Sequence, residues 1–124
     1  MNLLAFDTST EFMGIAVSRA LKGSTSVWEH TGAGGAQAST HLIAQVMALL
    51  QQADLPLQDL DAICFGAGPG SFTGLRTACA VAQGLAYGAG VPVLAVDSLL
   101  AVAEEARFHA LVGQPACRIT ALLD

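Results

Sequence analysis

Apolar and polar positions along the first third of the chain follow the pattern of short β-strands. Residues 2–6, 12–18 and 24–30 are rich in apolar or β-branched side chains, and short polar segments separate them. Residues 19–23 have a length and composition that suit a hairpin connection. The pattern therefore predicts three consecutive antiparallel strands.

The pattern becomes helical after the glycine-rich connection at residues 32–36. Between residues 40 and 53 apolar side chains recur every three or four positions, and Ser39 or Thr40 can cap the first turn. The apolar arc of this helix is wider than the stripe of about 100° that a core-facing surface helix needs. We therefore expect something besides its own sheet to cover part of the helix.

Strands and helices alternate in the second half of the chain. The pattern predicts strands at residues 61–66, 92–96 and 118–123 and helices at residues 71–87 and 98–107. Such alternation implies parallel crossovers, so the expected fold is an α/β domain over residues 1–124 with a mixed sheet. Residues 77–96 carry no charge, but Gly88, Gly90 and Pro92 interrupt them, so we interpret them as a buried helix and strand and not as a membrane span.

Composition narrows the classes of function. Hydrophobic residues make up 53% of the 124 residues and charged residues only 12%, which excludes disorder and suggests surface that a partner covers. A net charge of −5 gives the chain no electrostatic footprint for nucleic acid, so RNA would be held mostly by another protein. The three cysteines form no C-x-x-C pair and no secretory pattern precedes them, so we expect reduced thiols and a cytoplasmic protein.

The glycine-rich segment at residues 66–76 is the strongest local signal. It is expected to turn a strand into a helix, with positive φ angles at Gly68 and Gly70 and a helix cap at Ser71 or Thr73. Two interpretations remain open: its backbone N–H groups hold an anion near Arg76, or the glycines serve close packing. The candidate residues of this turn are Gly66, Gly68, Pro69, Gly70, Ser71, Phe72, Thr73, Gly74 and Arg76.

A polar turn between the first two predicted strands is the second candidate site. It consists of Asp7, Thr8, Ser9 and Thr10. A carboxylate and hydroxyls at such a turn can cup a phosphate, with the carboxylate holding a metal ion through water. In the alternative interpretation, Asp7 caps its own turn through a local hydrogen bond. We favour the structural interpretation.

Metal and nucleophile signals are weak. A metal-binding helix places two histidines at i and i+4, whereas His41 is followed at i+4 by Gln45, so we expect no metal site. Ser71 does not lie in a G-x-S-x-G motif, and no His and acid pair is marked by spacing. We therefore expect no catalytic residue in the chain.

The residues of both turns resemble those of the TsaB (YeaZ) family. The resemblance rests on residues 4–10 (LAFDTST), 66–76 (GAGPGSFTGLR) and 83–86 (QGLA), and it covers essentially the whole chain. It implies the ribonuclease-H-like half of the actin, hexokinase and Hsp70 ATPase folds. Members of the family usually continue into a second domain, so the chain resembles an amino-terminal half.

The resemblance also implies a function. TsaB proteins are described as non-catalytic partners of TsaD in forming threonylcarbamoyladenosine at position 37 of tRNA, with the ATPase TsaE joining them and tRNA contacted only indirectly. This implies no cofactor bound by the chain alone, with ATP or ADP possible at a partner interface. Two alternatives are an ATP-dependent phosphotransferase or ATPase of the actin-like superfamily and a glycoprotease-like (peptidase M22-like) protein.

The helices predicted at residues 40–53 and 71–87 are expected to form the partner surface. We predict that this helix pair docks a TsaD-like subunit, or a second copy of the chain when that subunit is absent. The alternative is that both helices only pack on the sheet. The predicted interface consists of His41, Leu42, Ile43, Val46, Met47, Leu50, Ala78, Ala82 and Ala86.

Overall fold

The computed structural model describes residues 1–35, 38–98 and 101. Strands and helices follow the predicted order. The elements are β1 (Leu3–Asp7), β2 (Phe12–Leu21), β3 (Ser24–Ala33), α1 (Ala38–Gln52), the 3-10 helix η2 (Leu57–Asp59), β4 (Ala62–Gly66), α2 (Phe72–Ala89) and β5 (Val93–Val96). The predicted helix at 98–107 falls mostly outside the described residues, and the predicted strand at 118–123 falls wholly outside them.

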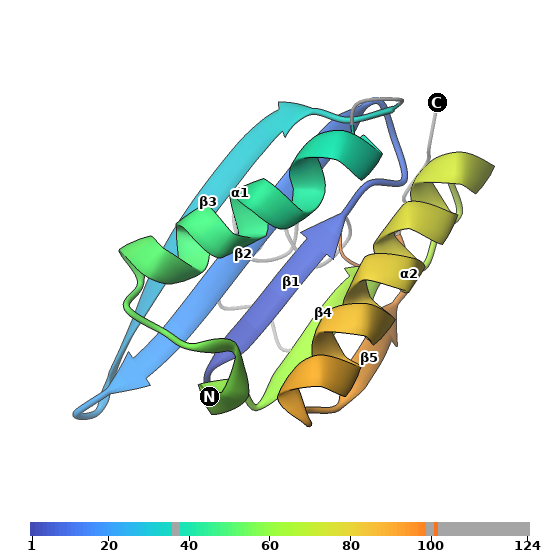
Figure 1. Cartoon of the computed structure of the whole chain (residues 1–124). Coiled ribbons are helices and arrows are strands. Elements are labelled where there is room, and N and C mark those ends of the chain that lie inside the picture. Colours follow the sequence, from blue (N-terminus) through green and yellow to red (C-terminus); the bar gives the residue numbers. More distant parts are fainter. Residues whose placement is uncertain (36–37, 99–100, 102–124) are drawn as a thin grey trace, which may run out of the picture.

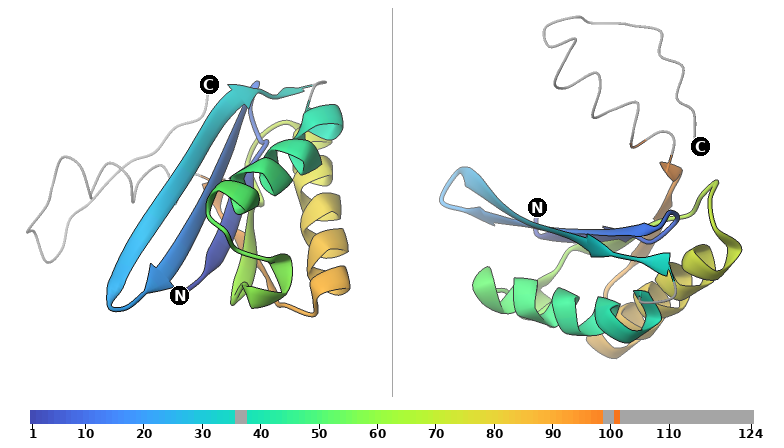
Figure 2. Two further views of the ribbon diagram at one scale, coloured as in Figure 1. Left: turned by 60° about the vertical axis from the view of Figure 1, so that its left-hand side comes forward. Right: turned by 90° about the horizontal axis from the view of Figure 1, so that it is seen from above.

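The five strands form one mixed sheet in the order β3-β2-β1-β4-β5. The pairs β1–β2 and β2–β3 are antiparallel, while β1–β4 and β4–β5 are parallel. This confirms the predicted meander followed by parallel crossovers. Both helices lie on the same face of the sheet, α1 over β2 and β3 and α2 over β4 (Figures 1 and 2).

The β2–β3 hairpin is longer than the sequence pattern suggested. Its connection is the two-residue turn Lys22-Gly23, in which both φ angles are positive (52° and 81°), and such turns match the twist of the flanking strands. Ten residues of β2 then pair one to one with ten of β3. The predicted loop at 32–36 begins too early, because β3 continues to Ala33 and the next residue, Gly34, donates its N–H to the Glu11 carbonyl at 2.7 Å.

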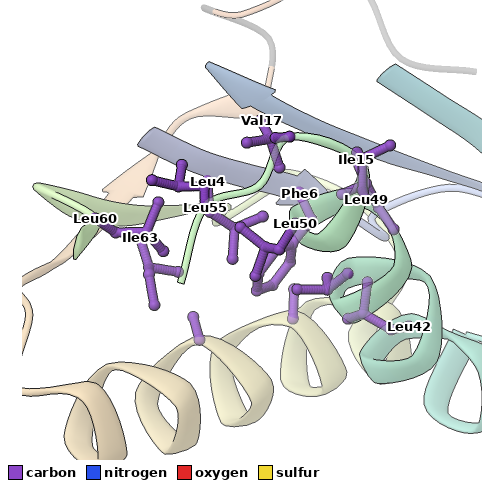
Figure 3. Close-up of a cluster of buried hydrophobic side chains, with 14 of the residues drawn as sticks. Leu4, Phe6, Ile15, Val17, Leu42, Leu49, Leu50, Leu55, Leu60 and Ile63 are labelled. Carbon is purple, nitrogen blue, oxygen red and sulfur yellow. The ribbon is translucent and has the colours of Figure 1, made fainter. Parts of the chain in front are cut away.

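The core lies between the sheet and the two helices (Figure 3). Alternate side chains of β1 and β2 point to this side and are buried, as strand periodicity requires. From the helices, α1 contributes leucines and Val46, while α2 contributes alanines that let it lie close to the sheet. The buried residues include Leu4, Phe6, Met13, Ile15, Val17, Leu42, Val46, Leu49, Leu50, Ile63, Ala78, Ala82 and Ala86.

The link from α1 to β4 was not predicted in detail. Arg19 on β2 donates from Nη1 to the Ala53 carbonyl at 2.9 Å, which satisfies an otherwise unpaired acceptor at the end of α1. Asp54 then turns the chain with a φ of 52°, and the single 3-10 turn η2 leads into β4. A three-residue turn of this kind has too little periodicity to be read from sequence.

Candidate functional site

The two turns singled out by sequence lie against each other at the ends of β1 and β4. Because β1 and β4 are parallel neighbours, their carboxyl ends meet at one edge of the sheet. The polar turn (residues 7–10) begins at the last residue of β1. The glycine turn (residues 66–76) runs from the last residue of β4 into the first turns of α2. The structure therefore brings the two candidate sites together into one.

Within the glycine turn, one predicted φ angle is confirmed and one is wrong. Gly68 has a φ of 100°, a conformation that favours glycine, and the bond between Gly68 and Pro69 is cis. Gly70 has no such φ; it is glycine for space, because a Cβ there would lie 2.5 Å from the Ser9 carbonyl oxygen. Ser71 caps α2 as predicted, since its side chain accepts a hydrogen bond from the Gly74 N–H at 3.3 Å.

Two further glycines allow the turns to touch. A Cβ at Gly66 would overlap the Asp7 carboxylate, and a Cβ at Gly74 would overlap the Thr8 carbonyl oxygen. Asp7, Thr8 and Ser9 thus each approach a different glycine. The sequence left open whether these glycines bind an anion or allow close packing. The structure supplies a packing reason for Gly66, Gly70 and Gly74, the three that approach the polar turn.

Hydrogen bonds join the turns as well. The buried Thr8 hydroxyl donates to the Gly74 carbonyl at 2.5 Å, and the Ser71 N–H donates to the Ser9 carbonyl at 2.7 Å. Among the described residues, every buried side-chain nitrogen or oxygen has a partner. The hydroxyl of Thr8, which the phosphate-loop interpretation would turn toward a ligand, points into α2.

The Asp7 carboxylate is held from two directions. Its Oδ1 accepts the Ser9 N–H at 2.7 Å, which is the Asx-type turn of the structural interpretation. Its Oδ2 accepts the Ser98 hydroxyl at 2.7 Å. Each oxygen keeps one further lone pair, but the orientation of the carboxylate is fixed by these two bonds.

Ser98 is a member of the site that sequence analysis treated only as a helix start. Its Oγ accepts the Gly68 N–H at 3.2 Å while donating to Asp7, and its own N–H donates to the Gly68 carbonyl at 2.8 Å. A signal for it existed: Ser98 follows β5, whose carboxyl end lies beside that of β4. Three strand ends, β1, β4 and β5, are thereby tied together through one hydroxyl.

A small cavity opens beside Asp7 on the sheet face opposite the helices. It has a volume of about 140 Å³, and its described lining includes Ala5, Asp7, Cys64 and Ser98. Burial raises the pKa of the Cys64 thiol above its ordinary value of 9.0, because the thiolate would lose solvation. Cys64 is therefore a neutral thiol near pH 7 and a poor nucleophile.

The described residues lack both a metal-binding cluster and a helix able to span a membrane. They contain no cluster of three or more His, Cys, Asp or Glu side chains that could hold a metal ion. No helix in this part of the chain is long and apolar enough to cross a bilayer.

The predicted partner surface has to be redrawn. Six of its nine residues point into the core and cannot line an outer surface: Leu42, Val46, Leu50, Ala78, Ala82 and Ala86. A helical wheel locates an apolar arc but does not tell which part of it faces the sheet, and the alanines turn out to serve contact with the sheet. His41, Ile43 and Met47 of α1 remain exposed.

The outer surface of α2 adds residues that were not assigned to the interface. Phe72 and Tyr87 are exposed near opposite ends of this helix, with Ala80 and Gly84 exposed between them. The Arg76 guanidinium lies over the Phe72 ring, 4.7 Å from its centroid. An exposed aromatic, arginine and methionine set is typical of protein interfaces.

Comparison with protein families and curated relatives gives consistent matches. A family model described as "TsaD: tRNA N6-adenosine threonylcarbamoyltransferase" matches residues 33–123. The tRNA threonylcarbamoyladenosine biosynthesis protein TsaB of Haemophilus influenzae is 38% identical over 109 residues, which are 86% of this chain and 43% of that protein.

Solved structures show the same relationship. YeaZ from Pseudomonas aeruginosa superposes with a TM-score of 0.76 at 40% identity, covering 87% of this chain and 49% of that one. RuvC of Thermus thermophilus superposes with a TM-score of 0.56 at 16% identity over 98% of this chain and 86% of that one, which shows the fold alone. The predicted ribonuclease-H-like fold is confirmed, and the chain spans about half the length of the TsaB and YeaZ relatives.

Proposed function

The chain belongs to the TsaD-related family, with TsaB (YeaZ) proteins among its relatives, and from that premise we propose that it acts in forming N6-threonylcarbamoyladenosine at position 37 of tRNA. In this proposal it is a non-catalytic scaffold or activating subunit. The transferase activity belongs to a TsaD-like subunit that docks on the chain. A TsaE-like ATPase joins through the complex, and tRNA is contacted only indirectly.

The outer face of α1 and α2 is the observation that carries this proposal. The two helices cover the same face of the sheet and contact each other, so their outer sides face away from the sheet together (Figure 1). Ile43 is 48% exposed, Met47 41%, Phe72 71% and Tyr87 92%. Exposed large apolar side chains on two neighbouring helices favour an interaction site, whereas a helix pair that only packed on its sheet would be expected to expose polar residues here.

Glycines within α2 support close docking by another backbone. A Cβ at Gly84 or Gly88 would meet nothing within 4 Å, so the chain's own packing does not require glycine there. Each glycine costs a helix about 1 kcal/mol relative to alanine. A partner helix lying against this bare stretch would offset that cost, and two helices from each subunit would then pack as a four-helix arrangement.

Three features of the polar site favour a non-catalytic role. The Thr8 hydroxyl and both Asp7 oxygens already bond to the chain itself, and Cys64 is protonated near neutral pH. We therefore propose no cofactor for the chain alone; a nucleotide would bind where partner residues complete a site. Calorimetry with Mg-ATP separates this role from that of an ATPase, which would bind nucleotide without a partner.

Co-purification with a TsaD-like subunit tests the proposal. Met47→Glu places a charge in the centre of the outer face and is expected to abolish capture of the partner while the far-UV circular dichroism spectrum stays unchanged. Gln52→Glu adds the same charge at the exposed end of α1 and should bind normally. Equal capture by both variants would move the interface elsewhere on the chain.

A further inference from the structure

The long edge strand β3 is a second surface whose features the helix face does not explain. In the described part of the chain no strand lies beyond β3, which forms one edge of the sheet, while β5 forms the other (Figure 1). The β5 edge has four residues, but β3 has ten. An edge strand carries unpaired N–H and C=O groups, and proteins usually shorten or block such edges.

Pairing with β2 shows which backbone groups of β3 are unpaired. Gly34 donates its N–H to Glu11, so the pair Glu11–Gly34 is hydrogen-bonded. Hydrogen-bonded and non-bonded pairs alternate along an antiparallel ladder, so the even-numbered residues of β3 bond to β2. The N–H and C=O groups of Thr25, Val27, Glu29, Thr31 and Ala33 therefore point away from the sheet.

Most of the devices that usually block an edge strand are missing from β3, although Glu29 places one carboxylate on it. The strand contains no proline and no lysine, and its one-to-one pairing with β2 over ten residues leaves no bulge. Its outward-bonding positions include threonines and Val27, which favour strands, and Val27 is 57% exposed. The edge is thus a regular template for another extended strand.

We propose that β3 pairs edge to edge with β3 of a second copy of this chain, in antiparallel orientation about a two-fold axis at Trp28. The two sheets would form one continuous sheet across the axis. The proposed contact is made by the backbone edge of β3 and not by the outer face of α1 and α2, although α1 lies over β3. The proposal does not rest on the function proposed above.

Self-pairing of the strand favours this register over its neighbours. When two identical strands pair antiparallel about a two-fold axis, one residue lies opposite the same residue of the other copy. Near the middle of β3 that residue is Trp28 or Glu29. Facing glutamates repel each other across strands. The axis at Trp28 instead places an aromatic pair at a close non-hydrogen-bonded position, with Val27 opposite Glu29 and Thr25 opposite Thr31.

The charges at the ends of the hairpin complement each other in this arrangement. Antiparallel pairing about Trp28 places Lys22, at the tip of one hairpin, beside Gly34 of the other copy. On that copy Gly34 is bonded to Glu11, which is exposed and acidic. Lys22 of one copy and Glu11 of the other are then separated by the strand that carries Gly34, and opposite charges at this spacing offset part of the repulsion between two chains of net charge −5.

Sedimentation velocity of the full chain tests the proposal, using Met47→Glu as background so that association through the helix face is removed. We expect this variant still to form a dimer. Adding Val27→Pro removes one outward N–H from each copy without breaking a bond to β2, and it should weaken the dimer about tenfold or more. Val27→Thr keeps the N–H and should leave the dimer intact.

Amide hydrogen exchange provides a readout that needs no edge variant. In the same Met47→Glu background, the amides of Thr25, Val27, Glu29 and Thr31 should exchange more slowly as protein concentration rises, while those of exposed turns should not change. A Met47→Glu protein that stays monomeric up to millimolar concentration would overturn the proposal. So would a dimer in which these amides stay unprotected, or one that Val27→Pro, folded by circular dichroism, leaves unweakened.

Discussion

The hydroxyl of Thr8 donates to the carbonyl oxygen of Gly74 at 2.5 Å, across 66 residues of sequence. This bond fixes the turn after β1 against the first turn of α2, and the Thr8 backbone approaches Gly74 so closely that no side chain fits between them. The close approach of the two backbones, and not ligand binding, therefore explains why residue 74 is glycine.

Gly74→Ala is therefore expected to destabilise the chain. Its new Cβ overlaps the Thr8 carbonyl oxygen, and overpacking of this kind costs about 1–3 kcal/mol. The free energy of unfolding from urea titration measures the loss.

Gly84→Ala is the matched control for this effect, because it makes the same change in the same helix. Its Cβ meets nothing within 4 Å, so the helix should gain up to about 1 kcal/mol from replacing glycine. If both variants shifted stability in the same direction, close contact with Thr8 would not be the reason for Gly74.

The sequence was sufficient to predict the order and type of the described elements. One side of each element faces the core, and this gives the apolar residues a period of 2 in β1 and β2 and of 3.6 in α1. It was not sufficient to orient α1. Val46 and Met47 are neighbours in one apolar arc, yet Val46 is fully buried and Met47 is exposed, since the direction of the sheet depends on tertiary packing.

Both turns of the candidate site could be found from sequence, but their contact could not. The residue types of the polar turn favoured a structural role, whereas those of the glycine turn left a ligand site and a packing site open. The close approach of Gly70 to Ser9 and the hydrogen bonds of Asp7 and Thr8 supply the packing role. Ser98 was missed as a member because its partners lie 30 and 91 residues away along the chain.

Ser98→Ala tests the tie between the three strand ends. The variant leaves Asp7 Oδ2 and the Gly68 N–H without their partner, and unsatisfied buried groups cost about 1–3 kcal/mol. Ser18→Ala removes a hydroxyl that makes only a 3.4 Å contact with the Met1 carbonyl, so it should change stability by less than about 0.5 kcal/mol. Equal effects of the two substitutions in chemical denaturation would show that Ser98 holds nothing together.

Cys64 should make stability depend on pH in alkaline solution. Its pKa is raised in the folded chain, so as pH rises through 9.0 the unfolded chain loses the thiol proton first. The folded state then binds more protons than the unfolded state, and the free energy of unfolding falls with rising pH. Cys64→Ala lacks this thiol, so its free energy of unfolding should not show this part of the decline. Near neutral pH the free energy of unfolding of wild type minus that of the variant should be constant, and above about pH 9 it should fall. A value that stays constant above pH 9 would contradict the burial effect.

Val46→Glu and Met47→Glu should separate folding from docking. Val46 is fully buried against the sheet, so an unpaired carboxylate there should cost more than about 4 kcal/mol and unfold the chain. Met47 points outward from the same turn of α1, so Met47→Glu should keep a melting temperature close to that of wild type and lose only the partner. Thermal melts of both variants, with co-purification of the folded one, measure the two effects. If Met47→Glu also unfolded the chain, its side chain would contribute to the core, and the outer face of α1 and α2 would lose the residue on which its assignment as a docking surface most depends.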